Sequence, residues 1–289
     1  MKIRINGKIV DITLEQEKTV GEVMASLEKW LADSGHRLSG LYIDEQRASS
    51  SSLEEIFKRE IDTINNIDIT TSSIAELSAE SLLGLIADIQ EYEKLNFEEK
   101  NKYIDIWKER PQALFIAEQM PDLHSFYVNC FSGSDMSSGV IFSITEERLR
   151  EVKDPLLELS KMQQLLDETC ARLVDLALDI QTGKEGRAAQ TIQIFSGIAE
   201  KVLRIYRQLK IQGYMSEAPD LNEKPITQII NGFGVLLNDL LEAYEKQDTV
   251  LVGDLAEYEA EPRLKELYTA ILKNSRQMPE TDEAVKAVK

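Results

Sequence analysis

The sequence predicts an α+β protein, in which a small strand-containing domain precedes a mainly α-helical region that ends in an antiparallel helix bundle. Residues 1–71 alternate apolar and polar side chains between turn signals, as strands and hairpins do. Later residues instead repeat apolar positions every three or four residues, which is typical of amphipathic helices. The 289 residues include only seven prolines and 14 glycines, which favours long helices over loop-rich β structure.

The chain is strongly acidic, with 51 acidic and 33 basic residues and a formal net charge of −18. Phosphate backbones and anionic lipid surfaces attract patches of Lys and Arg. We therefore expect neither nucleic acid nor a membrane as the main partner. The charge is compatible with a basic protein partner, or with a highly soluble chain that has no partner.

The sequence gives no signal for export or membrane insertion. The segment MKIRINGKIVDI has no apolar run of signal-peptide length, and no stretch of about 18 apolar residues could span a membrane. Cys130 and Cys170 match neither a disulfide framework nor the spacing of zinc ligands. These observations lead us to expect a cytoplasmic protein.

Residues 1–71 are predicted to form the first domain. KIRI and KIVDITL alternate on either side of Asn6-Gly7, which is the strongest short hairpin signal. Thr19 precedes a predicted helix, and Gly35 is a suitable residue just beyond its end. A short strand (41–43), a serine-rich loop, a brief helix and a final alternating segment complete the domain. The apolar stripe of the main helix consists of Val20, Val23, Leu27, Trp30 and Leu31.

This order of hairpin, helix, strand, short helix and strand resembles the ubiquitin-like β-grasp fold, in which one helix packs across a mixed sheet. Ubiquitin and its sulfur-carrier relatives end in a free Gly-Gly. Here the chain continues through Ser72 without a Gly-Gly, so carrier chemistry is not implied. What the resemblance implies is a binding module.

Residues 72–139 are predicted to be a helical connecting region. Asn96 with Glu99 three residues later resembles a helix N-terminal cap, and two prolines then separate short apolar helices. The segment SGSDMSSG (132–139) is predicted to be a flexible Ser/Gly loop or a domain boundary.

Residues 140–274 are predicted to form the antiparallel helix bundle, followed by a frayed polar tail at 275–289. Ser143 with Glu146 suggests another capping box. Four helices with apolar stripes are expected. The stripes are Leu156, Leu159, Met162, Leu166, Cys170, Leu173, Ala177 and Ile180; then Ala188, Ile192, Phe195, Ala199, Val202, Ile205 and Leu209; then Ile226, Ile229, Phe233, Leu237, Leu240 and Tyr244; and finally Leu251, Leu255 and Tyr258.

Pro262 is expected to bend the fourth helix, because proline removes a backbone donor and clashes with the preceding turn. The apolar stripe then continues from Leu264 on a rotated face. Residues 173–192 resemble residues 237–256, since both contain a helix end, a polar turn and a new helix start. A duplicated hairpin explains this likeness, and so does convergence of two amphipathic hairpins.

Two charged stripes are the candidate site residues. Asp254, Glu257 and Glu261 lie three and four apart on the fourth helix, and Lys201, Arg204 and Arg207 lie three apart on the second. If these helices are neighbours, the stripes could form an interhelical ion-pair seam. The alternatives are a surface that binds a partner and a solvated face without further role.

No residue pattern predicts catalysis, a cofactor or a metal. A di-metal carboxylate site in a bundle needs Glu-x-x-His pairs, whereas His36 and His124 both lie outside the predicted bundle. Cys170 lies on an apolar stripe with no histidine nearby in sequence, so it is expected to be a core residue.

The predicted function is therefore a non-catalytic protein–protein interaction protein, such as an adaptor, a scaffold or a chaperone-like binder of a basic or helical partner. The predicted bundle is similar to the small flagellin-export chaperones, which wrap a helical client. The alternative is an enzyme or small-molecule binder with a site between the β-grasp and helical domains. A third expectation is a homo-oligomer.

Overall fold

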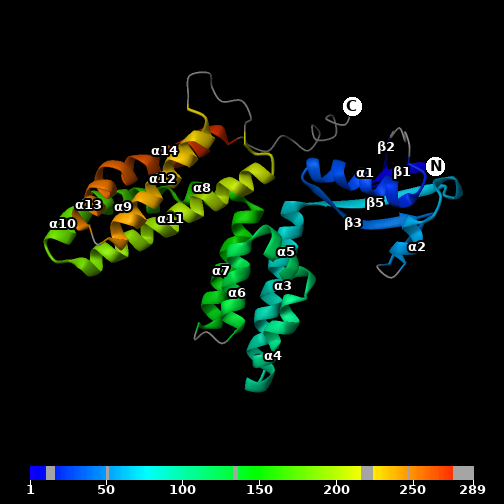
Figure 1. The fold of residues 1–289 in the computed structure, drawn as a ribbon, viewed down its shortest axis with the longest axis horizontal. Helices are drawn as coiled ribbons and strands as arrows, with labels where there is room; N and C mark the ends of the chain where they lie inside the picture. Colours follow the sequence, from blue (N-terminus) through cyan, green and yellow to red (C-terminus); the bar gives the residue numbers. More distant parts are fainter. Residues whose placement is uncertain (11–16, 50–51, 133–135, 216–223, 247, 276–289) are drawn as a thin grey trace. The chain divides into compact units, whose positions relative to one another are not determined.

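A computed structural model of the chain describes residues 1–10, 17–49, 52–132, 136–215, 224–246 and 248–275 (Figure 1). Contacts divide the chain into two compact units, Met1–Glu146 and Glu147–Lys289. The first unit contains a sheet and helices, and the described part of the second consists of helices and their connections. The fold is thus α+β with a mainly helical remainder, as the sequence predicts.

Five strands of the first unit form a mixed sheet in the order β2-β1-β5-β3-β4. β1 pairs antiparallel with β2 and parallel with β5, while β3 pairs antiparallel with β5 and β4. Asn6 and Gly7 connect β1 to β2 with φ angles of 49° and 78°, and two positive φ angles suit the twist of a tight hairpin. This sheet is compatible with a β-grasp. The strands are β1 (Lys2–Ile5), β2 (Lys8–Val10), β3 (His36–Ile43), β4 (Gln46–Arg47) and β5 (Asn66–Ser73).

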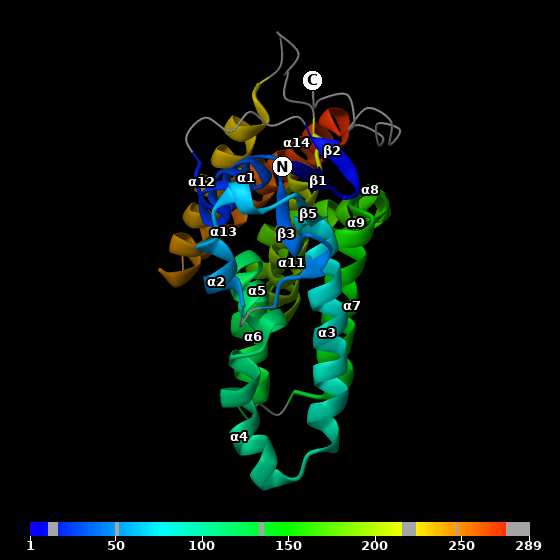
Figure 2. The same ribbon diagram turned by 90° about the vertical axis from the view of Figure 1, so that its right-hand side faces the viewer.

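Helix α1 (Val20–Asp33) covers one face of the sheet (Figures 1 and 2). The Thr19 side chain accepts a hydrogen bond from the Glu22 N–H, and the Glu22 carboxylate accepts one from the Thr19 N–H. Gly35, with φ of 71°, follows the end of the helix as predicted. Trp30 departs from the predicted stripe, because 45% of its surface is exposed. The core on this face includes Val20, Val23, Met24, Leu27, Ile3, Ile67 and Ile69.

Short helices and four longer ones complete the described first unit before α7. Asn96 accepts a hydrogen bond from the Glu99 N–H at 3.0 Å and so begins α4, as predicted. Two prolines each occupy the first position of a helix, where a missing N–H breaks no intrahelical bond. The elements are α2 (Leu53–Phe57), η1 (Ile61–Thr63), α3 (Ile74–Lys94), α4 (Phe97–Lys108), α5 (Pro111–Gln119) and α6 (Pro121–Phe131).

Asp88 is a buried carboxylate inside the helical part of the first unit. Its oxygens accept hydrogen bonds from Trp107 Nε1 at 2.9 Å and Gln112 Nε2 at 3.2 Å. Arg110 adds a charged donor at 2.5 Å. A charged group can remain buried when hydrogen-bond donors replace the water around it. Because the donors and the acceptor belong to different helices, this network also joins α3, α4 and α5.

Helix α7 (Ser138–Lys153) corrects one prediction. Ser143 and Glu146 do not start a helix, because both lie inside α7. The buried side chains of Ile141 and Thr145 lie four residues apart, so helical spacing continues past Ser143. Thr145 also donates a hydrogen bond to the Ile141 carbonyl at 2.7 Å.

The second unit is helical, as predicted for this part of the chain. The helix expected over 156–180 consists of three consecutive helices, although most of its apolar stripe is buried. Gly183 and Gly213 both have φ of 73° and follow the ends of α10 and α11. The elements are α8 (Pro155–Lys161), α9 (Gln163–Val174), α10 (Leu176–Gln181), α11 (Glu185–Ile211), α12 (Ile226–Glu245), α13 (Thr249–Leu255), η2 (Ala256–Ala260) and α14 (Glu261–Asn274).

The η2 segment is a π-helical turn, and Pro262 follows it at the start of α14. This turn changes the buried face that the sequence predicts for the fourth helix. Tyr258 is 67% exposed, and Leu251 is exposed as well. Because a π turn contains an extra residue, it keeps side chains four apart on one face, where an α-helix would rotate them away. The buried side chains are Val252, Ala256, Ala260 and Leu264.

Replacing Leu173 by alanine should lower the free energy of unfolding of the second unit by about 2 kcal/mol. Leu173 is buried in the core of this unit, but it also lines a hollow into which its neighbours can relax. The loss should therefore lie near the lower end of the usual range for leucine. Urea denaturation measures it, and an unchanged midpoint would contradict the core assignment.

Two predictions about chain organisation fall partly outside the described residues. Residues 133–135 of the predicted Ser/Gly loop are not described, although Ser138 and Gly139 belong to α7. Nearly all of the predicted polar tail is undescribed, from residue 276 onward. The boundaries at 71, 139 and 274 stay predictions. Over the residues that are described, no helix is both long and apolar enough to cross a membrane.

Candidate functional site

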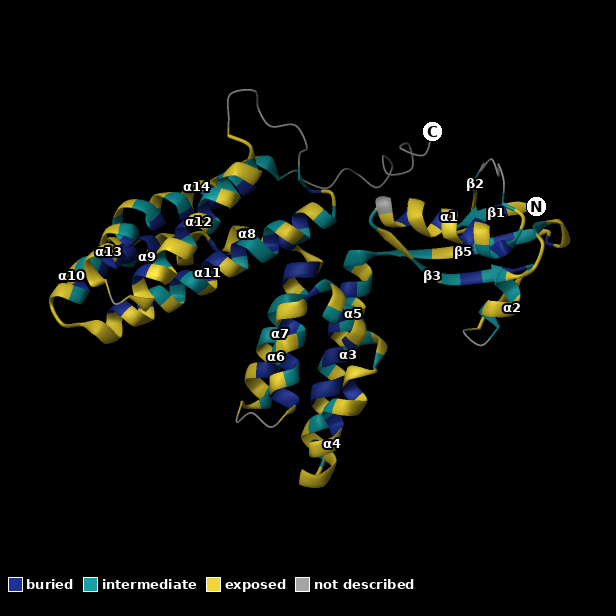
Figure 3. Ribbon diagram, in the orientation of Figure 1, coloured by how far each residue is buried: buried dark blue, intermediate teal, exposed yellow. Residues whose placement is uncertain are grey.

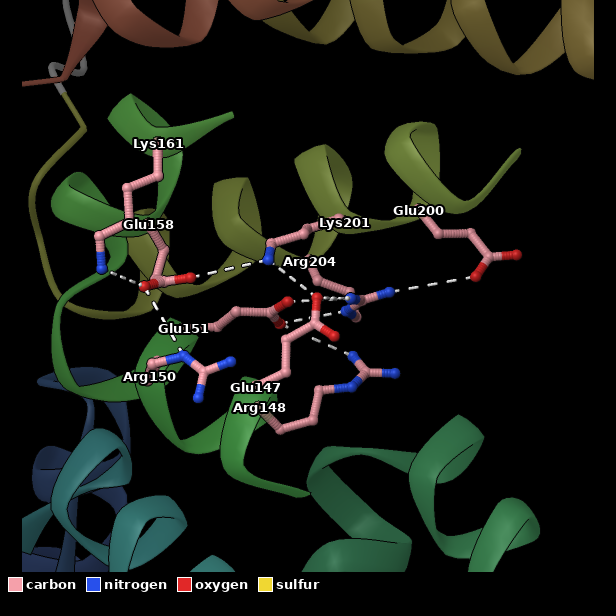
Figure 4. Close-up of polar contacts among 9 residues, drawn as sticks. All are labelled: Glu147, Arg148, Arg150, Glu151, Glu158, Lys161, Glu200, Lys201 and Arg204. Atoms are coloured by element: carbon pink, nitrogen blue, oxygen red, sulfur yellow. Dashed lines mark hydrogen bonds and ion pairs between the residues drawn. The ribbon is translucent and has the colours of Figure 1, made fainter. Parts of the chain in front are cut away.

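Lys201 and Arg204 belong to a cluster of ion pairs within the second unit (Figure 4). Lys201 Nζ lies 2.8 Å from a Glu147 oxygen and 3.6 Å from a Glu158 oxygen. Arg204 binds Glu151 with two nitrogens, at 2.8 and 3.1 Å. The basic stripe of α11 therefore pairs with carboxylates of α7 and α8.

Two carboxylates of this cluster are shielded from water, and cations lie within ion-pair distance of both. Glu151 and Glu158 are buried, and Lys161 reaches Glu158 at 2.9 Å. Burial acts to raise the pKa of Glu147, but the hydrogen bond from Lys201 and the charges of Lys201 and Arg204 outweigh it and lower that pKa. A saturated network of this kind fixes how three helices pack.

The acidic stripe lies elsewhere. Asp254 is exposed, Glu257 and Glu261 are half-buried, and Glu261 pairs with Lys265 at 2.5 Å within its own helix. Arg207 of the basic stripe is also exposed. Within the described part of the chain, no ion pair joins the two stripes.

A groove lined mainly by apolar side chains runs between α11 and α12 in the second unit. Its deeper part encloses about 260 Å³ and adjoins a more open hollow of about 730 Å³, which shares Ile192, Tyr244 and Val252 with it. We call the two together the α11–α12 groove. The wall from α12 consists of Leu237, Leu240, Leu241 and Tyr244. The wall from α11 consists of Ala188, Ala189, Ile192, Phe195 and Ser196. Leu173, Leu176 and Ala256 also line it.

Large apolar side chains remain exposed along this groove. Tyr244 is 58% exposed, Leu241 is exposed to a similar degree, and Val250 is exposed close by in the sequence. Helix α12 contains buried, half-buried and exposed residues (Figure 3). At the inner end, Phe195 and Phe233 bring α11 and α12 together, with ring centroids 6.1 Å apart. Contiguous exposed apolar surface beside a groove typically marks a binding site.

One carboxylate lines the α11–α12 groove, and helical spacing places two more beside its lining residues. Glu185 lines its open end, Glu245 follows Leu241 by four residues, and Glu200 follows Ser196 by four residues. All three are exposed. From Phe233 to Ala260 the sequence contains seven acidic residues and one lysine, Lys246, which pairs with Glu242.

The sequence patterns do not predict this groove, although one signal for it is present. The apolar stripe predicted for α12 contains Leu237, Leu240 and Tyr244 but not Val235, Leu236 or Leu241. Apolar residues thus cover more than one face of α12. A helix with a second apolar face has a surface that its own bundle does not fill.

The described residues contain no cluster of His, Cys, Asp and Glu able to hold a metal ion. Both cysteines are buried. Burial raises the pKa of the Cys170 thiol to about 11, so this thiol is protonated at neutral pH.

Two family descriptions match separate parts of the chain. Residues 1–73 match the TP0873 N-terminal domain, and residues 158–270 match a domain of unknown function, DUF8042. The second match contains every residue that lines the α11–α12 groove. Over 278 residues the chain is 21% identical to an uncharacterized protein of Treponema pallidum (strain Nichols). The aligned region covers 94% of this chain and 96% of that protein. No solved structure gives a significant match.

Proposed function

We propose that this protein is a non-catalytic protein-binding protein, acting as an adaptor, a scaffold or a chaperone-like binder. The observation that supports this most directly is the α11–α12 groove, with Leu241 and Tyr244 exposed along it. Burying such side chains against a partner releases the water that covers them, which drives most protein association.

The residues of the groove suit binding better than catalysis. Its deeper part is lined mainly by apolar side chains, and the hydroxyl groups there belong to Ser196 and Tyr244. A nucleophilic serine needs a base within hydrogen-bond reach, and the lining residues include no histidine. The alternative function, an enzyme or small-molecule binder with a site between the β-grasp and helical domains, stays a prediction.

We also propose that residues 1–71 form a ubiquitin-like β-grasp domain used for recognition. The strand order β2-β1-β5-β3-β4 and the position of α1 across one face support this assignment. A cytoplasmic location and a basic protein partner complete the proposal. The cysteine content supports the location, and the net charge of −18 supports the basic partner.

A photo-crosslinking amino acid placed at residue 244 or at residue 235 tests whether the groove binds a protein. Tyr244 and Val235 are 58% and 57% exposed on the same helix, and their nine-residue separation places them on opposite faces. In the cells that produce the full-length protein, residue 244 should give a discrete cross-linked protein and residue 235 should not. Equal adducts at both residues, or none at 244, would refute the groove as the binding site.

A further inference from the structure

We infer that the α11–α12 groove binds a short amphipathic α-helix whose apolar stripe is flanked by Lys and Arg. This inference rests on the proposed function, because it names the chemistry of the protein partner. Three features support it, namely the spacing of the lining residues, the backbone of the walls and the charge of the margin.

The lining residues follow helical spacing on both walls. Leu237, Leu240, Leu241 and Tyr244 occupy positions i, i+3, i+4 and i+7 of α12. Ala188, Ile192 and Phe195 form a similar stripe on α11. From Glu185 to Ser196 the lined part of α11 measures about 16 Å, which matches roughly three turns of a partner helix.

The walls favour a helix over an extended segment. Both walls are α-helices, whose N–H and C=O groups bond within each helix and leave none for a partner strand. An extended segment in the groove would have backbone groups without partners, whereas a helix satisfies its own. Small residues on the α11 side, such as Gly186 and Ala189, allow a partner backbone to come close.

The margin of the groove selects a cationic partner. Glu185 lines the groove, and i,i+4 spacing from Ser196 and Leu241 places Glu200 and Glu245 beside the apolar lining. No ion pair is described for Glu185 or Glu245. Lys or Arg residues beside the apolar stripe of a partner would face these carboxylates. A second copy of this chain fits poorly, because it would bring a second segment with seven acidic residues and one lysine against the first.

Three labelled peptides bound to the full-length protein test the inference. The first has a Leu/Ala stripe flanked by Lys, the second has the same stripe flanked by Glu, and the third is a scrambled form of the first. Fluorescence anisotropy should show at least tenfold tighter binding of the first peptide than of either other peptide. Raising the salt concentration should weaken this binding, because exposed charges are screened.

Variants of exposed residues locate the binding. The double substitution Glu185→Gln with Glu245→Gln should weaken binding of the Lys-flanked peptide about threefold to tenfold. Asp239→Asn, on another face of α12, should leave that binding unchanged. Tyr244→Ser should weaken it at least tenfold. Circular dichroism verifies that each variant remains folded.

The outcomes distinguish this inference from the proposed function. Equal binding of the Lys-flanked and Glu-flanked peptides overturns the cationic partner, and equal binding of the scrambled peptide overturns the helix. Failure of all three peptides to bind also overturns the inference. Concentration-dependent dimers that Tyr244→Ser abolishes would assign the groove to a second copy. Cross-linking at residue 244 decides the proposed function independently of these results.

Discussion

Replacing Trp107 by alanine is expected to lower the free energy of unfolding of the first unit by about 4 kcal/mol. Trp107 is fully buried, and its ring stacks on His124 and Tyr127 with centroids 5.4 and 5.7 Å apart. Its Nε1 also donates to Asp88, so the substitution opens a cavity and removes a donor from a buried carboxylate. Urea denaturation followed by far-UV circular dichroism measures the loss.

Trp30→Ala is the matched control for this experiment. It removes the same side chain from α1, where 45% of the Trp30 surface is exposed. We expect the free energy of unfolding to fall by about 1 kcal/mol, because much of the Trp30 side chain stays in contact with water in the folded protein. Similar losses for the two variants would show that the aromatic cluster around Trp107 contributes no special stability.

Replacing Arg204 by alanine should lower the free energy of unfolding of the second unit by about 3 kcal/mol. Arg204 binds Glu151 through two nitrogens, and only 2% of the Glu151 side chain is exposed. Removing the cation leaves a buried carboxylate with Arg148 as its nearest described cation, at 3.9 Å. Arg207→Ala, three residues later on the exposed side of α11, should change stability by less than about 0.5 kcal/mol.

The pH dependence of stability tests the same cluster. The pKa of Glu147 is lowered in the folded protein, so its pairing stabilises the second unit above the ordinary carboxyl pKa. This stabilisation is lost as the pH falls through the lowered pKa. In Arg204→Ala the acid-dependent loss should be smaller, because one of the charges that lowers the pKa is gone. An identical pH dependence in both proteins would contradict this role of Arg204.

Local signals in the sequence predicted much of the fold. The hairpin at Asn6-Gly7, the N-terminal cap at Asn96 and the helix end near Gly35 are all present. Each of these features depends on a few neighbouring residues, so a single sequence is enough to predict them.

Features that depend on packing were harder to predict. Ser143 and Glu146 match a capping box, but the apolar spacing around them extends α7 through both. The partners of Lys201 and Arg204 depend on which helices are neighbours, and α7 and α8 supply them. The α11–α12 groove exists because α11 and α12 meet at Phe195 and Phe233 and leave their outer apolar residues uncovered.

The π turn at Ala256–Ala260 has a consequence for changes in chain length. Deleting one residue there would allow ordinary α-helical geometry, because a π turn holds one residue more than the α-helical turn that spans nearly the same rotation. Leu264, Leu267 and Ile271 would then keep their positions in the core. A single-codon deletion within this turn is therefore expected to preserve the last helix, whereas a deletion within the regular part of α14 would rotate every later residue by about 100°.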